Sequence, residues 1–125
     1  MHRGAAAYRH IESETRSPLE LVVMLYDGAI RFVNEAREAA DRQDIAARTR
    51  AVSRALAIVT ELQNRLHLED GGDVAKELDR LYSYLTSRLL DSNIKRDRTA
   101  LDEVHRLLRT VRDGWAQVSA KERQA

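Results

Sequence analysis

The feature that most constrains the fold is a recurrence of apolar residues every three or four positions. The clearest series lies near the end of the sequence: Leu101, Val104, Leu108, Val111, Trp115 and Val118. Residues at this spacing share one face of an α-helix, because each residue turns the helix by about 100°. The chain of 125 residues contains a single proline, Pro18, and proline is the strongest helix breaker. The sequence therefore predicts an all-α fold.

The periodicity divides the chain into four amphipathic segments. The predicted helices cover about residues 18–41, 45–68, 74–93 and 100–118. The connections between them are short, which favours antiparallel neighbours. We therefore expect an up-down four-helix bundle over residues 17–118. Residues 1–16 have no sustained period and are predicted to form a mobile N-terminal arm, while residues 119–125 form a C-terminal tail.

Capping residues support these boundaries. Ser17, with Glu20 three positions later, has the spacing of a capping box, and proline follows it at the first helical position. Asp44 and Asp73 are predicted to cap the next two helices, and Thr99 the last one.

The first predicted helix carries more apolar surface than a bundle core requires. A core stripe needs about three positions in seven, and we assign it as follows: Val22, Leu25, Ala29, Phe32 and Ala36. Leu21, Met24 and Tyr26 are then surplus. Such surface is usually covered, and here the arm, a second copy of the chain or a partner could cover it. The alternative is that the first helix is more enclosed by the bundle than the others, so that these residues belong to the core. Gly28 is expected to let a neighbouring helix approach closely.

Composition excludes several classes of function. The absence of cysteine removes disulfides, cysteine zinc sites and thiol nucleophiles. The net charge of +1 argues against a nucleic-acid binder. No apolar run is long enough to span a membrane, and the first residues do not resemble a secretory signal. No catalytic constellation is evident, and the pair Asp102 and His105 is too small a set for a bundle metal site.

Two other functions for a helical bundle stay open. The run HRLLRT, residues 105–110, loosely matches the histidine motif of phosphorelay modules, but it lacks the small residue that admits a receiver domain. A dimeric scaffold is the other alternative.

Three longer stretches resemble the FliS family of flagellar export chaperones. They are LVVMLYDGAIRFVNEA (21–36), LYSYLTSRLLDSN (81–93) and LDEVHRLLRTVRDGW (101–115). Tyr8, which precedes the Ser-Pro at the start of the first helix, also fits the family. The resemblance covers about residues 8–118. It departs mildly at the DSN run that ends in Asn93, and the second helix matches only in pattern.

The resemblance implies a cytoplasmic chaperone that binds the disordered C-terminal segment of flagellin and prevents its premature polymerisation. It further implies delivery to the flagellar type III export apparatus, with an export-gate component as second partner. Neither enzyme activity nor a cofactor is implied. Amphipathic helices of the cargo would dock in apolar grooves. Tyr8 and Ile11 would form a lid, and Leu21, Met24 and Ile58 would line the groove of a monomer or weak homodimer.

Overall fold

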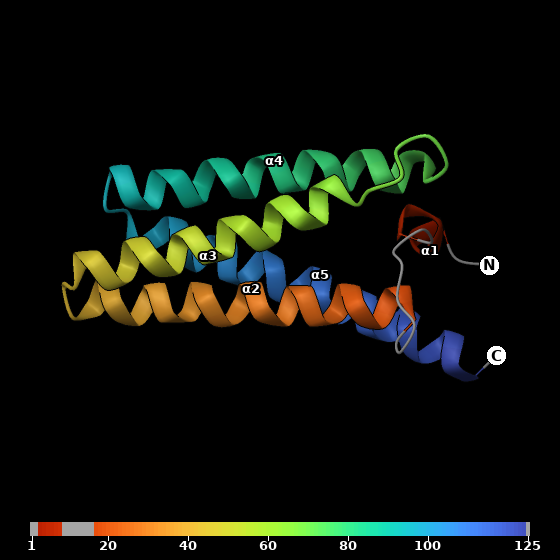
Figure 1. Ribbon diagram of the computed structural model, residues 1–125, viewed down its shortest axis with the longest axis horizontal. Coiled ribbons are helices and arrows are strands. Elements are labelled where there is room, and N and C mark those ends of the chain that lie inside the picture. Colours follow the sequence, from red (N-terminus) through yellow and green to blue (C-terminus); the bar gives the residue numbers. More distant parts are fainter. Residues whose placement is uncertain (1–2, 9–16, 125) are drawn as a thin grey trace.

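The computed structural model describes residues 3–8 and 17–124, and these residues form helices joined by short connections (Figure 1). The helices are α1 (Arg3–Tyr8), α2 (Pro18–Asp41), α3 (Ile45–Asn64), α4 (Gly72–Ile94) and α5 (Arg98–Gln124). The four long helices pack as an antiparallel bundle, and the short α1 lies at the end where α2 begins (Figure 1). The predicted all-α bundle is confirmed.

The first two long helices begin at their predicted caps. The Ser17 hydroxyl accepts a hydrogen bond from the Glu20 backbone N–H at 3.1 Å and donates one to the Glu20 carboxylate at 3.2 Å. The Asp44 carboxylate accepts the backbone N–H of Ala47 at 3.0 Å. Each cap satisfies an N–H group that the first helical turn leaves without a partner.

The later helix starts differ from the prediction. α4 begins at Gly72, with no side-chain cap; the φ of Gly72 is +62°, a conformation that glycine adopts readily. α5 begins at Arg98, and its cap is Asp97, not Thr99. The Asp97 carboxylate accepts the N–H groups of Thr99 at 3.0 Å and Ala100 at 3.4 Å.

Two helix ends also differ. α3 stops at Asn64, and not near residue 68, because the chain turns toward α1: the N–H of His67 donates to the carbonyl of Ala7 at 2.9 Å. α5 continues beyond Val118 to Gln124, through a segment of good helix formers that includes alanine, lysine, glutamate and arginine.

The core face of α5 is the predicted one. Its buried apolar positions are Ala100, Leu101, Val104, Leu108 and Trp115, with Val111 and Val118 half-buried. The face of α2 is rotated from our assignment, because Tyr26 is fully buried whereas Leu25 and Phe32 are half-buried. Tyr26 can be buried there because its hydroxyl lies 2.6 Å from that of Tyr82 on α4.

The predicted arm is partly helical and contributes to the core, which corrects our expectation for its first half. Ala7 and Tyr8 at the end of α1 are fully buried. Gly71 permits this approach, since a Cβ atom at that position would lie 3.1 Å from the Cα of Ala7. α1 is therefore packed at the junction of α3 and α4.

Among the described residues, no helix combines the length and the apolar character that a membrane span requires.

Candidate functional site

Accessible apolar side chains follow the outer side of the α2–α3 pair. The side chain of Met24 is 48% exposed, while Leu21 and Ile58 are half-buried at the edge of the core. Gly28 lies one turn after Met24, and a Cβ atom there would be 3.2 Å from Cδ1 of Ile58. Gly28 thus makes room for Ile58 to pack against the backbone of α2. We call Leu21, Met24, Gly28 and Ile58 the α2–α3 seam.

The apolar part of this surface ends at Phe32, which lies one turn beyond Gly28. The guanidinium carbon of Arg31 lies 4.9 Å from the Phe32 ring centroid, and that of Arg54 on α3 lies 5.7 Å from it. Both distances are within the range of cation–π contacts. From this point the surface between α2 and α3 becomes charged.

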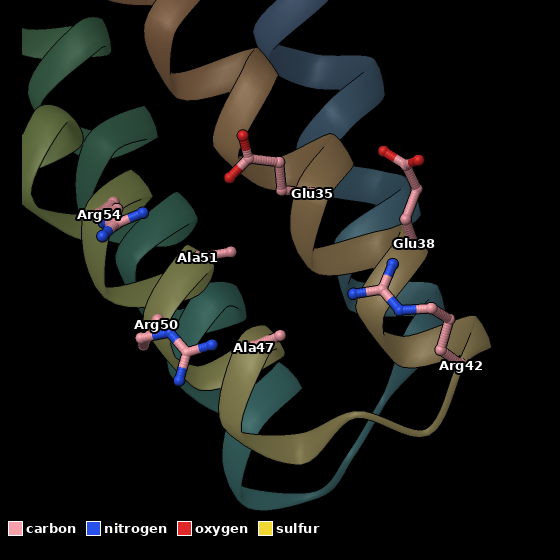
Figure 2. Close-up of a pocket in the computed structure, with 7 residues that line it drawn as sticks. All are labelled: Glu35, Glu38, Arg42, Ala47, Arg50, Ala51 and Arg54. Carbon is pink, nitrogen blue, oxygen red and sulfur yellow. The ribbon is translucent and has the colours of Figure 1, made fainter.

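A hollow of about 230 Å³ continues from there toward the α2–α3 connection (Figure 2). Figure 2 shows its lining: Glu35, Glu38, Arg42, Ala47, Arg50, Ala51 and Arg54. The two glutamates belong to α2, whereas Arg50 and Arg54 belong to α3. Within the described residues these four charged groups form no ion pair with one another, so their charges face solvent and can pair with a partner. The hollow has no signature in the sequence, because it depends on the antiparallel register of the two helices.

The structure brings three of the five predicted site residues to one surface. Leu21 and Met24 precede Gly28 at a spacing of three and four, so they share its helix face, and Ile58 of α3 meets that face at Gly28. Tyr8 does not; it is fully buried inside the end of the bundle. Ile11 lies outside the described residues.

Tyr8 belongs instead to a cluster of buried aromatic residues. Its hydroxyl donates to the carbonyl of Leu62 at 3.1 Å and lies 2.6 Å from the Tyr82 hydroxyl. Its ring meets Trp115 edge-on, with 5.4 Å between centroids and 74° between planes. Burial, reinforced by the neighbouring tyrosines, raises the pKa of Tyr8, Tyr26 and Tyr82.

A signal for this cluster was present in the sequence. Val22, Tyr26, Ala29, Val33 and Ala36 also follow a spacing of three and four. This series describes the buried face of α2 better than the one we assigned, which treated Tyr26 as surplus.

The surroundings of His105 argue against phosphotransfer. Its Nε2 atom is buried and has no hydrogen-bond partner. Burial, together with the charges of Arg37 and Arg109, lowers the pKa of His105. A phosphoryl donor needs access to an imidazole nitrogen, and the Nε2 atom of His105 is enclosed. Nor do the described residues contain a group of three or more histidine, aspartate or glutamate side chains arranged to hold a metal ion.

Comparison with known proteins adds an independent line of information. The family described as "Flagellar protein FliS" matches residues 1–122. The flagellar secretion chaperone FliS of Salmonella typhimurium is 36% identical over 123 residues, covering 94% of this chain and 91% of the relative. The chaperone FliSB of Pseudomonas aeruginosa is 36% identical over 103 residues, covering 82% of each chain. The FliS of Vibrio cholerae is 31% identical over 122 residues, covering 94% and 90%.

The match extends over nearly the whole chain and includes the helices that form the seam and the tyrosine cluster. The relatives are secretion chaperones, not enzymes. The chain belongs to the FliS family of flagellar secretion chaperones.

Proposed function

We propose that this protein is a cytosolic export chaperone that binds the disordered C-terminal segment of flagellin. Bound flagellin cannot polymerise before secretion, and the complex is delivered to the flagellar type III export apparatus through a component of its gate. The observation that carries the proposal is the α2–α3 seam, where Met24 is 48% exposed one turn before Gly28, the residue against which Ile58 packs. The names of the relatives, which are flagellar secretion chaperones, supply the class of cargo.

The seam has the character of a site for an amphipathic helix. Such a helix places its apolar face in a groove and is held mainly by apolar side chains at positions i, i+3, i+4 and i+7. Ordering a disordered segment costs part of the binding free energy, so a long contact is required. The seam provides apolar contact at Leu21, Met24 and Ile58.

The charged hollow extends the same surface and would orient the cargo. Glu35 and Glu38 form its α2 side, whereas Arg50 and Arg54 form its α3 side. A bound helix with basic residues on one flank and acidic residues on the other fits in one direction only, because reversing the helix brings like charges together.

α1, with Tyr8 at its end, acts as a lid in this proposal, and Ile11 belongs to the same segment of sequence. Six residues form α1, and the Tyr8 side chain anchors them between Leu62 and Tyr82. Withdrawal of Tyr8 would open an aromatic pocket beside Trp115 at one end of the bundle. An apolar cargo side chain could then occupy that pocket. The free protein is a monomer or weak homodimer.

Isothermal titration of the full chain with flagellin tests the proposal. Flagellin without its last helical segment is the comparison ligand, and we expect it not to bind. Met24→Glu should weaken binding by about tenfold or more, because an unpaired carboxylate would be buried in the complex. Its helicity and thermal stability should stay near wild type, since Met24 is already half-exposed.

Leu90→Glu is the matched control, because Leu90 on α4 is 45% exposed and lies outside the seam. It should bind as wild type does. Equal binding of truncated flagellin would contradict recognition of the C-terminal segment. Wild-type affinity of a folded Met24→Glu variant would place the binding surface away from the seam.

A further inference from the structure

The α2–α3 and α4–α5 connections lie at the end of the bundle opposite α1 (Figure 1). Residues of both connections and of the adjoining helix ends line a cavity. Its volume is about 520 Å³. Its lining residues are Ala40, Gln43, Ile45, Arg48, Arg96 and Arg98. Three of these six residues are arginines and none is acidic. The cavity is distinct from the seam and from the tyrosine cluster.

Arg48 is the unusual member of this set. It is only 7% exposed, and its Nε atom is buried without a hydrogen-bond partner. The one hydrogen bond that its side chain makes with a described residue, from Nη2 to the carbonyl of Asn93, is long at 3.5 Å. Within the part of the chain that the structure describes, no carboxylate pairs with it. A buried guanidinium is costly unless it is paired. An anion in the cavity would give Arg48 a negative partner and an acceptor for its Nε–H.

The other two arginines differ in how far they are neutralised. Arg98 is paired with Asp41 and Asp102, the latter at 3.1 Å. Arg96 has neither a hydrogen bond nor an ion pair with any described residue. The charges of Arg48 and Arg96 therefore stay uncompensated, and the cavity is positive.

Two residues that line the cavity have a backbone conformation that is unfavourable for a residue with a side chain. Gln43 has a φ of 59° and Arg96 a φ of 53°, and among the described non-glycine residues these are the positive values. Each follows the C-cap of a helix, α2 and α4 respectively, a position usually occupied by glycine. Both residues line the cavity. A glycine at either position would relieve the strain of a positive φ, but it would remove a polar side chain from the cavity.

We propose that this cavity binds a phosphate group, either as free phosphate or as the phosphate of a small monoester. The arginines come from α3, from the α4–α5 connection and from α5, so their donors approach from separate directions. A tetrahedral anion presents oxygens in several directions, whereas a single carboxylate presents two in one plane. Arginine remains charged at any physiological pH and suits phosphate geometry. The volume exceeds that of phosphate alone, which leaves room for a small organic group.

The test is an NMR titration of the full chain that follows the Arg48 Nε–H resonance and the backbone amides of Arg96 and Arg98. The probes are sodium phosphate and glycerol 3-phosphate, with sodium chloride at matched ionic strength as the reference. We expect saturable shifts at these groups with both phosphates. Tighter binding of the glycerol ester identifies a monoester as the ligand, and equal affinity identifies phosphate itself. Shifts that chloride reproduces, or that never saturate, would overturn the proposal.

Arg96→Gly is the decisive variant. It removes a charge from the cavity and relieves the positive φ, so folding should be retained or improved. It should weaken phosphate binding by about fivefold or more. Gln43→Gly relieves the same backbone conformation without loss of charge, and Arg80→Gln removes an exposed arginine on α4; both should retain most of the affinity. If Arg96→Gly binds phosphate as tightly as wild type, or if Arg80→Gln weakens binding equally, the cavity is not the site.

Discussion

The hydroxyl oxygens of Tyr8 and Tyr82 lie 2.6 Å apart, although 74 positions separate the two residues in the sequence. Because Tyr8 donates its proton to the carbonyl of Leu62, it accepts from Tyr82. Tyr82 then accepts from Tyr26, whose hydroxyl is also 2.6 Å away. The result is a directional chain of hydrogen bonds that joins α2, α4, α1 and α3, with every hydroxyl in it satisfied.

Tyr82→Phe should destabilise the fold by about 1–3 kcal/mol, because it removes the middle of this chain and leaves the Tyr26 hydroxyl as a buried donor without a partner. Chemical denaturation in urea measures the change. Tyr84→Phe is the control, since Tyr84 is exposed and, among the described residues, its hydroxyl bonds only Glu103. It should have a smaller effect. Equal effects of the two substitutions would contradict the hydrogen-bond chain.

The same cluster predicts a loss of stability in alkali. Burial raises the pKa of Tyr8, Tyr26 and Tyr82 above the ordinary value of 10.0. Above pH 10 the unfolded chain therefore binds fewer protons than the folded one, and stability falls as the pH rises. The slope is about 1.4 kcal/mol per pH unit for each buried tyrosine.

Absorbance at 295 nm and circular dichroism, recorded together, test this expectation. The chain has four tyrosines. Only the exposed Tyr84 should ionise before helicity is lost, and the other three should ionise together with unfolding. Tyr82→Phe should reduce the slope. Ionisation of all four tyrosines in a fully helical protein would contradict the burial of the cluster.

Local signals in the sequence were sufficient for the long helices. The spacing along α5 identified its buried face, and Ser17 and Asp44 identified two helix starts. No such signal marks α1, because six residues with little apolar surface do not predict a helix. What holds α1 is long-range: the hydroxyl of Tyr8 meets Tyr82 from another part of the chain.

The candidate surface was predictable to a similar extent. Leu21 and Met24 stood out as apolar positions beyond the need of a core, and Gly28 as a point of close helix approach. The close approach of Ile58 on α3 to Gly28 on α2 supports that interpretation of Gly28. The arginine cavity could not be foreseen, since its lining comes from two connections whose spatial proximity only the fold establishes.

Loss of the Ser17 cap should weaken the first turn of α2 without disturbing the bundle core. Ser17→Ala should cost about 1 kcal/mol, because it removes the acceptor of the Glu20 N–H. Hydrogen exchange should become faster in the first turn of α2 and stay unchanged in α4. Unchanged exchange at residues 18–22 would show that the hydroxyl contributes nothing to the helix start.

At the start of α5 the structure predicts an order of effects. Asp97→Ala should destabilise more than Thr99→Ala, because Asp97 accepts the helix N–H groups whereas Thr99 only donates to Asp97. Thermal unfolding of both variants measures the order. A larger loss of stability in Thr99→Ala than in Asp97→Ala would indicate that Thr99 is the cap.

Gly71 and Gly114 should respond in opposite directions to alanine. A Cβ atom at Gly71 would lie 2.5 Å from Cβ of Ala75 and 2.7 Å from the carbonyl oxygen of His67, so Gly71→Ala should cost more than about 1 kcal/mol. Gly114 lies within α5 with open space around it, and Gly114→Ala should stabilise by up to about 1 kcal/mol. Urea denaturation compares the pair. A neutral Gly71→Ala would show that Ala75 and the carbonyl of His67 lie less close to Gly71 than the structure has them.

Trp115 should report directly on the docking of α1, because it is the only tryptophan and its ring meets Tyr8 edge-on. Tyr8→Ala removes a fully buried aromatic ring and should cost about 3–5 kcal/mol. Water would then reach the indole, so its fluorescence emission should move to longer wavelength while circular dichroism still shows a helical bundle. Deletion of residues 1–16 should give the same emission, since it removes the same ring; our first expectation, that this segment lies outside the core, would have predicted no change.

Tyr8→Phe separates the ring from the hydroxyl. It keeps the contact with Trp115 and loses only the hydrogen bonds to Leu62 and Tyr82, so emission should stay as in wild type with a loss of about 1–2 kcal/mol. If Tyr8→Ala leaves both the emission and the free energy of unfolding unchanged, α1 is not docked in solution. If Tyr8→Phe shifts the emission as far as Tyr8→Ala does, the hydrogen bonds, and not the packing of the ring, hold α1 in place.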